Sequence, residues 1–157
     1  MQTKQTTEVN NLVVRGSISQ SDAGAAATAL ANQRTLTAAG IIGLGDNGKT
    51  LFIDNATGFI TTLPVPVAGF SCEVINKTAN TSGNHTLVSN GSANVIKGNQ
   101  NSVAGDAGDS GTADDTISFV ANQSVAGDRV ELRSDGTSWF AYATSRVAAG
   151  ITFTQAG

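Results

Sequence analysis

The sequence has few of the residues that carry most protein chemistry. Its 157 residues include one cysteine, one histidine, one tryptophan, one tyrosine and two prolines. The single cysteine, Cys72, excludes a disulfide within the chain, and its apolar neighbours in the sequence indicate a small buried side chain rather than a reactive thiol. A single histidine leaves a metal site built from several imidazoles of one chain without support.

Charge is also scarce, and it does not cluster. Only 13% of the residues are charged, and the net charge is −3. Nine scattered Lys and Arg residues argue against a phosphate backbone as partner, so we expect no nucleic acid partner. No apolar run approaches the roughly 20 residues of a membrane span, so we expect no membrane partner. The polar start, Met1 to Glu8, lacks the apolar run of a secretory signal, which predicts synthesis in the cytoplasm.

What the sequence has in abundance is short β-branched and aromatic runs between turn-forming residues. From Thr35 onward these runs recur at roughly 8–12 residue spacing, separated by Gly, Asn and Asp. We predict an all-β fold, an antiparallel β-sandwich or jelly-roll-like barrel, with at most one short helix. The predicted strands are Leu51–Ile53, Phe59–Leu63, Phe70–Ile75, Thr86–Val88, Val95–Ile96, Thr116–Val120, Val130–Arg133, Trp139–Ala143 and Ile151–Phe153.

One predicted strand pair has a clear signature. From Arg129 to Arg133 apolar and charged residues alternate, as a half-buried antiparallel strand requires. Asp135-Gly136 supplies the positive φ angles of a tight hairpin, which predicts that this strand pairs with Trp139 to Tyr142. Trp139 is therefore predicted to anchor the core or an interface.

The first 36 residues differ from the β body predicted for residues 37–157. They combine a polar start, one apolar run and an alanine-rich stretch from Ala23 to Ala31. We expect an N-terminal arm, which is either extended or helical over the alanines, because a helix this short is marginal alone. Its large apolar residues are too few for a core, so we expect them to contact a partner or another subunit: Leu12, Val13, Val14 and Leu30.

Two further segments are not predicted to be central strands. Pro64 and Pro66 remove two backbone donors, which places their segment at an edge or at a crossing between sheets. Residues 98–115 are predicted to form a long loop, which is usually functional or ordered by a partner. This loop holds Asp106, Asp109, Asp114 and Asp115, for which we predict a solvated acidic loop, with a calcium site as the alternative.

The sharpest match to a chemical motif is Gly43 to Thr50, which satisfies the phosphate-loop pattern of Gly, four residues and Gly-Lys-Thr. That chemistry requires a helix after the loop, with its N-terminal amides facing the phosphates. The residues after Thr50 are instead strand-like, so we predict a glycine-rich turn that binds no nucleotide. His85 is predicted to be a surface strand or turn residue.

Paired carboxylates for glycoside hydrolysis need two acids held across a cleft, and the acids here lie mostly in turns. Aromatic residues are also too few for the usual sugar-stacking platform. We therefore expect no enzymatic activity.

Four segments resemble parts of small structural proteins of tailed bacteriophages. They are Gly48-Lys49-Thr50-Leu51-Phe52, Leu63 to Phe70, Val125-Ala126-Gly127-Asp128 and Ser134 to Trp139, and the similarity extends over about Thr35 to Phe153. The chain is similar in these segments to capsid decoration, or cement, proteins, and related β domains occur in phage tail fibres.

The resemblance implies a virion structural protein that binds the outer surface of a phage capsid and stabilises it. The implied partners are the major capsid protein and other copies of the chain, in a homotrimer. The resemblance thus implies that the arm residues contact the capsid or another subunit: Leu12, Val13, Val14 and Leu30. The implied location is the capsid surface, after synthesis in the host cytoplasm, and neither a cofactor nor catalytic residues are implied. The alternative function is a tail-fibre or receptor-binding β module that recognises a host surface.

Overall fold

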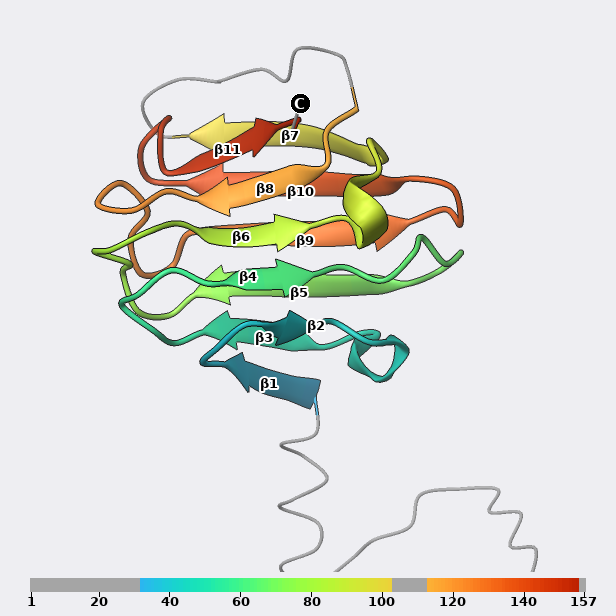
Figure 1. Cartoon of the computed structure of the whole chain (residues 1–157), viewed down its shortest axis with the longest axis horizontal. Helices are drawn as coiled ribbons and strands as arrows, with labels where there is room; N and C mark the ends of the chain where they lie inside the picture. The colour runs from blue at the N-terminus through green and yellow to red at the C-terminus, as the bar shows by residue number, and fades with distance from the viewer. Residues whose placement is uncertain (1–31, 103–112, 156–157) are drawn as a thin grey trace, which may run out of the picture. The chain divides into compact units, whose positions relative to one another are not determined.

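The structure is a computed structural model that describes residues 32–102 and 113–155, and these residues form two mixed β-sheets (Figure 1). The six-stranded sheet has the order β1 (Gln33–Leu36), β3 (Thr50–Ile53), β5 (Ser71–Asn76), β9 (Arg129–Ser134), β10 (Trp139–Ser145) and β7 (Ile96–Ser102). The five-stranded sheet has the order β11 (Ile151–Thr154), β8 (Thr116–Phe119), β6 (His85–Val88), β4 (Ile60–Thr62) and β2 (Gly40–Ile41). The described residues contain no α-helix, and their 3-10 turns are η2 (Leu44–Asp46) and η3 (Asn90–Ser92), with Asn32 also in 3-10 conformation. The prediction of an all-β fold is therefore confirmed.

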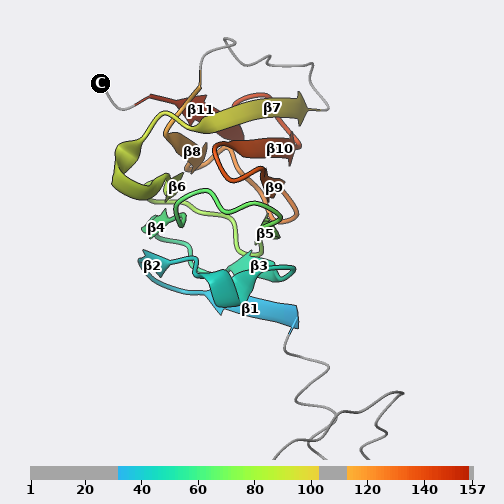
Figure 2. The same ribbon diagram turned by 90° about the vertical axis from the view of Figure 1, so that its right-hand side faces the viewer.

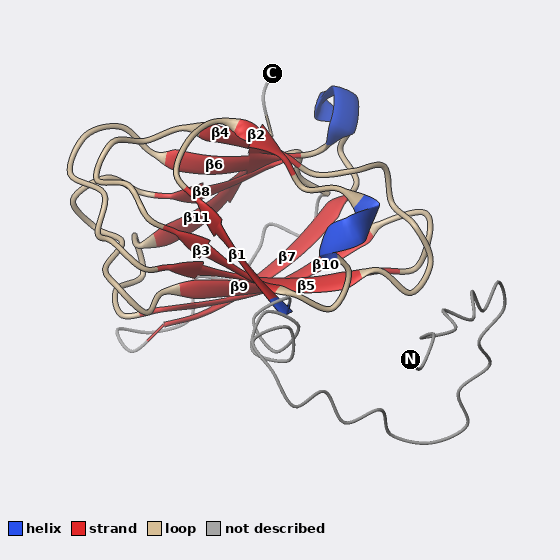
Figure 3. Cartoon of the chain, turned by 90° about the horizontal axis from the view of Figure 1, so that it is seen from below, coloured by secondary structure: helices blue, strands red, loops and turns tan. Residues whose placement is uncertain are grey.

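The two sheets lie as separate layers with the apolar core between them (Figures 2 and 3). Side chains alternate between buried and less buried positions along β5, β9 and β10, as the period of two of a strand with one covered face demands. Trp139 and Phe119 are the largest side chains that are fully buried in this core.

The first six strands wind as a coil between the two layers. Odd-numbered strands β1, β3 and β5 lie in one sheet and even-numbered strands β2, β4 and β6 lie in the other, and neighbours within each set run parallel. Parallel neighbours need a crossover connection, and here the crossover is a strand of the opposite sheet rather than a helix. The prediction of an antiparallel fold was wrong for this half, because alternation shows which face is buried and not which strand is the neighbour.

Successive turns of the coil touch backbone to backbone at Gly58. The Gly58 amide donates to the Ser82 carbonyl at 2.6 Å, and Thr57 and Ser82 form an isolated parallel bridge. A Cβ at residue 58 would overlap the backbone of Gly83 and Asn84. Only glycine fits where the two turns meet.

The second half of the chain supplies the antiparallel pairs. β9 and β10 pair in antiparallel register with Ser134 opposite Trp139, which confirms the predicted pairing and gives the hairpin a four-residue loop, 135–138. β9 also pairs with β5, and β8 lies between β6 and β11. β7 pairs with β10 in parallel.

Each of the nine predicted strands overlaps an observed strand, but three strand regions differ from the prediction. β1 and β2 were not predicted, and β1 lies inside the range assigned to the arm. β7 continues to Ser102, so residues 98–102 are strand and not loop. Residues 1–31 lie outside the described residues, so the arm itself stays a prediction.

Candidate functional site

An exposed apolar loop lies between β4 and β5. Residues 63–70, which we call the apolar loop, carry no polar side chain. Its two ends, Leu63 and Phe70, are buried in the core, whereas Val65 and Val67 are 57% and 36% exposed between them. Two prolines restrict the backbone of this loop. This surface was not predicted from the sequence, although its run of eight residues without a polar side chain is a local signal.

Trp139 supports the apolar loop from below. Its ring is fully buried and meets the Phe70 ring edge-on, with 5.4 Å between the ring centroids. Its Nε1–H donates to the Pro64 carbonyl at 3.3 Å. The structure thus places the predicted anchor residue in the core, directly beneath an exposed apolar surface.

Three segments that are distant in sequence, residues 48–52, 63–70 and 134–139, meet at this end of the β body. The Gly69 amide donates to the Ser134 carbonyl at 3.0 Å, and the Ser134 amide donates to the Phe70 carbonyl at 2.9 Å. A Cβ at Gly136, in the β9–β10 loop, would lie 3.2 Å from Ala68. The Gly48 amide donates to the Ser71 carbonyl at 2.7 Å. Segments distant in sequence therefore form one connected surface.

The β9–β10 loop next to the apolar loop is fixed by Asp135. Its Oδ1 accepts hydrogen bonds from the Ser138 and Thr137 amides at 2.7 and 2.8 Å. These amides hold the pKa of Asp135 below its ordinary value. The loop is thus closed by its own carboxylate.

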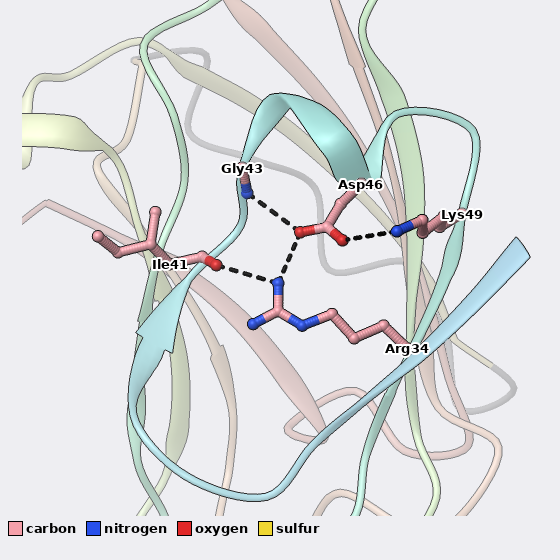
Figure 4. Close-up of polar contacts among 5 residues, drawn as sticks. All are labelled: Arg34, Ile41, Gly43, Asp46 and Lys49. Atoms are coloured by element: carbon pink, nitrogen blue, oxygen red, sulfur yellow. Dashed lines mark hydrogen bonds and ion pairs between the residues drawn. The ribbon is translucent and has the colours of Figure 1, made fainter. Parts of the chain in front are cut away.

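The glycine-rich segment 43–50 binds a carboxylate of its own chain (Figure 4). Asp46 Oδ2 accepts from the Gly43 amide at 3.1 Å and from Arg34 Nη1 at 2.6 Å, and Asp46 Oδ1 lies 3.3 Å from Lys49 Nζ. Arg34 Nη1 also donates to the Ile41 carbonyl at 3.1 Å. Burial raises the pKa of Asp46, but these partners outweigh it and leave the pKa below its ordinary value.

This geometry accounts for the phosphate-loop pattern. The Gly43 amide and the Lys49 ammonium group, both within the pattern, are directed at Asp46, as is Arg34 from β1. The residues after Lys49 form β3, as predicted, so no helix terminus faces the loop. The ion pair between Arg34 and Asp46 thereby connects β1 to the turn after β2.

A shallow charged groove of about 550 Å³ crosses the outer face of the six-stranded sheet. Glu73 and Glu131 line it and lie directly opposite each other on β5 and β9, a pair that the sequence analysis missed by placing the acids mostly in turns. An arginine lies 3.6 Å from each carboxylate, Arg129 at Glu73 and Arg133 at Glu131. A glycosidase acid needs apolar surroundings, whereas these carboxylates lie on an open face beside cations.

His85 and Cys72 are both buried. The prediction of a surface position for His85 was wrong, because its side chain is buried and faces the core on β6. Its Nε2 lies 2.8 Å from the Asn55 carbonyl oxygen, and its ring packs against Phe59. Since a carbonyl only accepts, Nε2 carries the proton. Burial raises the pKa of the Cys72 thiol to about 12, which agrees with the expected unreactive side chain.

The predicted acidic loop is only partly a solvated loop. Asp114 and Asp115 are buried, and the Asp115 carboxylate accepts from the Thr116 hydroxyl at 2.7 Å. Asp106 and Asp109 lie outside the described residues. Within the described ranges no three side chains of His, Cys, Asp or Glu gather as a metal site would require.

The residues predicted to contact a capsid or another subunit, Leu12, Val13, Val14 and Leu30, lie outside the described residues, and their role stays a prediction. The part of the chain that is described contains no helix of the length and apolarity needed to cross a membrane. No protein-family model, no curated protein and no solved structure matches the chain.

Proposed function

We propose that this chain is a non-enzymatic virion structural protein that binds the outer surface of a phage capsid and stabilises it as a decoration protein. We assign the described body to the β-sandwich class, because two sheets enclose one core. A jelly roll is built from antiparallel neighbours, whereas the strand pairs β1–β3, β3–β5, β2–β4, β4–β6 and β7–β10 are parallel.

The observation that carries the proposal is the rigid apolar loop. Val65 and Val67 are exposed, while their neighbours Leu63 and Phe70 are fixed in the core. Exposed apolar side chains on a fixed backbone are suited to binding another protein, because little conformational entropy is lost when the contact forms. The loop is also one of the four segments that resemble phage structural proteins.

A decoration protein binds a repeating lattice, so each contact needs only modest affinity. Burying one valine side chain contributes about 1.5 kcal/mol or more. Several such contacts per molecule, repeated over linked copies on one particle, give strong binding collectively. An N-terminal arm that carries Leu12, Val13, Val14 and Leu30 would add contacts to the major capsid protein or to neighbouring subunits.

The test is co-sedimentation of the protein with capsids that lack it. We expect the double substitution Val65→Asp and Val67→Asp to weaken capsid binding by about tenfold or more, since each change removes apolar contact and adds a charge at the interface. The matched control is Thr144→Asp, an exposed position on β10 away from the loop. A variant lacking residues 2–31 retains β1 and is expected to bind more weakly than the full chain.

Equal binding by the loop variant, the control and the wild type would contradict a role for the loop. Binding by none of the proteins, wild type included, would favour the tail-fibre or receptor-binding alternative. Circular dichroism of each variant shows whether the β fold is retained.

A further inference from the structure

Three dipeptides of the chain have a sequence that favours cyclisation of a side chain onto the backbone. They are Asn47-Gly48, Asn90-Gly91 and Asp135-Gly136, each with its glycine at positive φ. In this reaction the backbone nitrogen of the glycine attacks the side-chain carbonyl carbon of the residue before it. Asparagine is chemically labile, and a following glycine has no side chain to obstruct the attack. The structure distinguishes the three dipeptides by what holds the two reacting groups.

Both reacting groups of Asn47-Gly48 are held by Ser71. The Asn47 Oδ1 accepts from the Ser71 amide at 2.9 Å. The Gly48 amide donates to the Ser71 carbonyl at 2.7 Å. Attack of the Gly48 nitrogen on the Asn47 side chain would require both hydrogen bonds to break, so the fold protects this dipeptide.

The reacting groups of Asp135-Gly136 are also held. The Asp135 Oδ1 accepts from the Ser138 and Thr137 amides at 2.7 and 2.8 Å, and the Gly136 amide donates to the Ser134 hydroxyl oxygen at 3.2 Å. The two amides keep the pKa of Asp135 below its ordinary value, so the carboxyl group stays ionised. An ionised carboxylate resists nucleophilic attack because it has no good leaving group.

Asn90-Gly91 is not held in this way. Asn90, Gly91 and Ser92 form η3, and all three residues are exposed. Among the residues that the structure describes, neither the Asn90 side chain nor the Gly91 amide has a hydrogen-bond partner. The turn is closed by its neighbours instead, because the Ser92 amide donates to the Ser89 carbonyl at 3.0 Å and the Ser89 hydroxyl donates to the Ala93 carbonyl at 2.6 Å.

We propose that Asn90 is a self-modification site, at which the folded chain converts this asparagine to aspartate or isoaspartate. The Gly91 nitrogen bonds to the side-chain carbonyl carbon of Asn90. The bond from that carbon to the side-chain nitrogen breaks, and ammonia leaves with the proton of the Gly91 amide. Water then opens the resulting five-membered imide ring at either of its two carbonyl groups. Water is the co-reactant, and no group is oxidised or reduced.

The modification site lies at the same end of the body as the apolar loop (Figure 1). The Leu63 amide, at the start of the apolar loop, donates to the Val88 carbonyl at 2.8 Å, two residues before Asn90. The Trp139 amide donates to the Val95 carbonyl at 2.8 Å, so the segment after η3 reaches the residue that supports the loop. Conversion of Asn90 adds a negative charge to this end, and isoaspartate also adds a methylene group to the backbone of the turn. An effect on capsid binding rests on the proposed function, whereas the conversion itself does not.

Peptide mapping by mass spectrometry, after incubation of the full chain at mildly alkaline pH without capsids, tests the proposal. In the folded protein we expect Asn90 to convert about tenfold faster than Asn47, or faster still. In a strong denaturant the two rates should become similar, because the dipeptides have the same sequence and only the fold distinguishes them. Asn90→Gln should remove most of the ammonia released by the folded protein, since glutamine would have to form a less favourable six-membered ring. The matched control, Asn47→Gln, should leave the release unchanged.

Equal rates for Asn90 and Asn47 in the folded protein would overturn the proposal. So would an Asn90 that converts in denaturant but stays intact in the folded protein, because the turn would then protect it as Ser71 protects Asn47. Both results are obtained without capsids, so this proposal and the proposed function can fail separately.

Discussion

Asp46 occupies the position in the glycine-rich segment 43–50 toward which the nearby donors point. Its carboxylate accepts from the Gly43 amide and from Arg34, and Lys49 lies beside its other oxygen. A carboxylate whose pKa is lowered in the folded chain stabilises the fold above its ordinary pKa, near 3.9, and that contribution is lost as the pH falls through the lowered value. Asp46 therefore contributes to acid sensitivity only below about pH 4.

The buried His85 is expected to make the free energy of unfolding depend on pH in a higher range than Asp46 does. Burial lowers its pKa, and the hydrogen bond to Asn55 only partly offsets that effect. The unfolded chain takes up a proton near pH 6.5 while the folded chain does not, so the free energy of unfolding should fall as the pH drops below about 6.5. We expect His85→Gln, which retains a donor for the Asn55 carbonyl, to lose this dependence.

Urea unfolding of both proteins between about pH 7.5 and pH 5 measures the effect of His85. A wild type whose stability is constant over this range would show that the buried ring does not resist protonation. Both proteins should still lose stability below about pH 4, where the aspartates titrate.

Substitution of Trp139 is expected to have a large effect on the stability of the fold. Its ring is fully buried, packs against Phe70 and donates to the Pro64 carbonyl. Trp139→Ala should lower the free energy of unfolding by about 3–5 kcal/mol, and Trp139→Phe by less, because the phenyl ring retains most of the packing. Chemical denaturation measures both changes, and an unchanged midpoint for Trp139→Ala would be inconsistent with a buried ring.

At the scale of elements, the coil of β1 to β6 depends on glycine where two turns touch. A methyl group at residue 58 would overlap the backbone of Gly83 and Asn84, which are not free to move as a side chain would be. We expect Gly58→Ala to lower the melting temperature by several degrees. The control is Gly45→Ala, an exposed position where a Cβ meets nothing within 4 Å. Equal melting temperatures for the two variants would argue against the close contact between successive turns.

Strand positions were predictable from the sequence, and strand neighbours were not. The alternation in Arg129 to Arg133 and the turn after it defined a hairpin, because both signals are local. The parallel pairing of β3 with β5 joins strands that are separated by a strand of the other sheet, and no local pattern records it. Gln33–Leu36 and residues 98–102 were missed because they are mostly polar residues held in strands by their neighbours.

The sequence also did not predict which polar side chains are buried. His85 and Asp115 lie among residues typical of turns and strand ends, so the sequence suggested solvent exposure for both. Long-range partners bury them instead, as Asn55 does for His85 over 30 residues of sequence. The apolar loop was within reach of sequence reasoning, since Pro64 and Pro66 exclude a central strand and the run between them has no polar side chain.

At the scale of the whole molecule, the described body presents three different surfaces. One outer face is charged, the other is uncharged, and one end carries the apolar loop above Trp139. Separate surfaces allow a protein to contact more than one partner at the same time, which the decoration role proposed above would require.

The most direct test of this account is to locate the protein on virions by electron cryomicroscopy, comparing particles with and without it. The account predicts additional density at regular positions over the outer capsid surface, with the apolar loop directed at the major capsid protein. Density confined to the tail or its fibres, with a bare capsid surface, would contradict the account and assign the protein to host recognition.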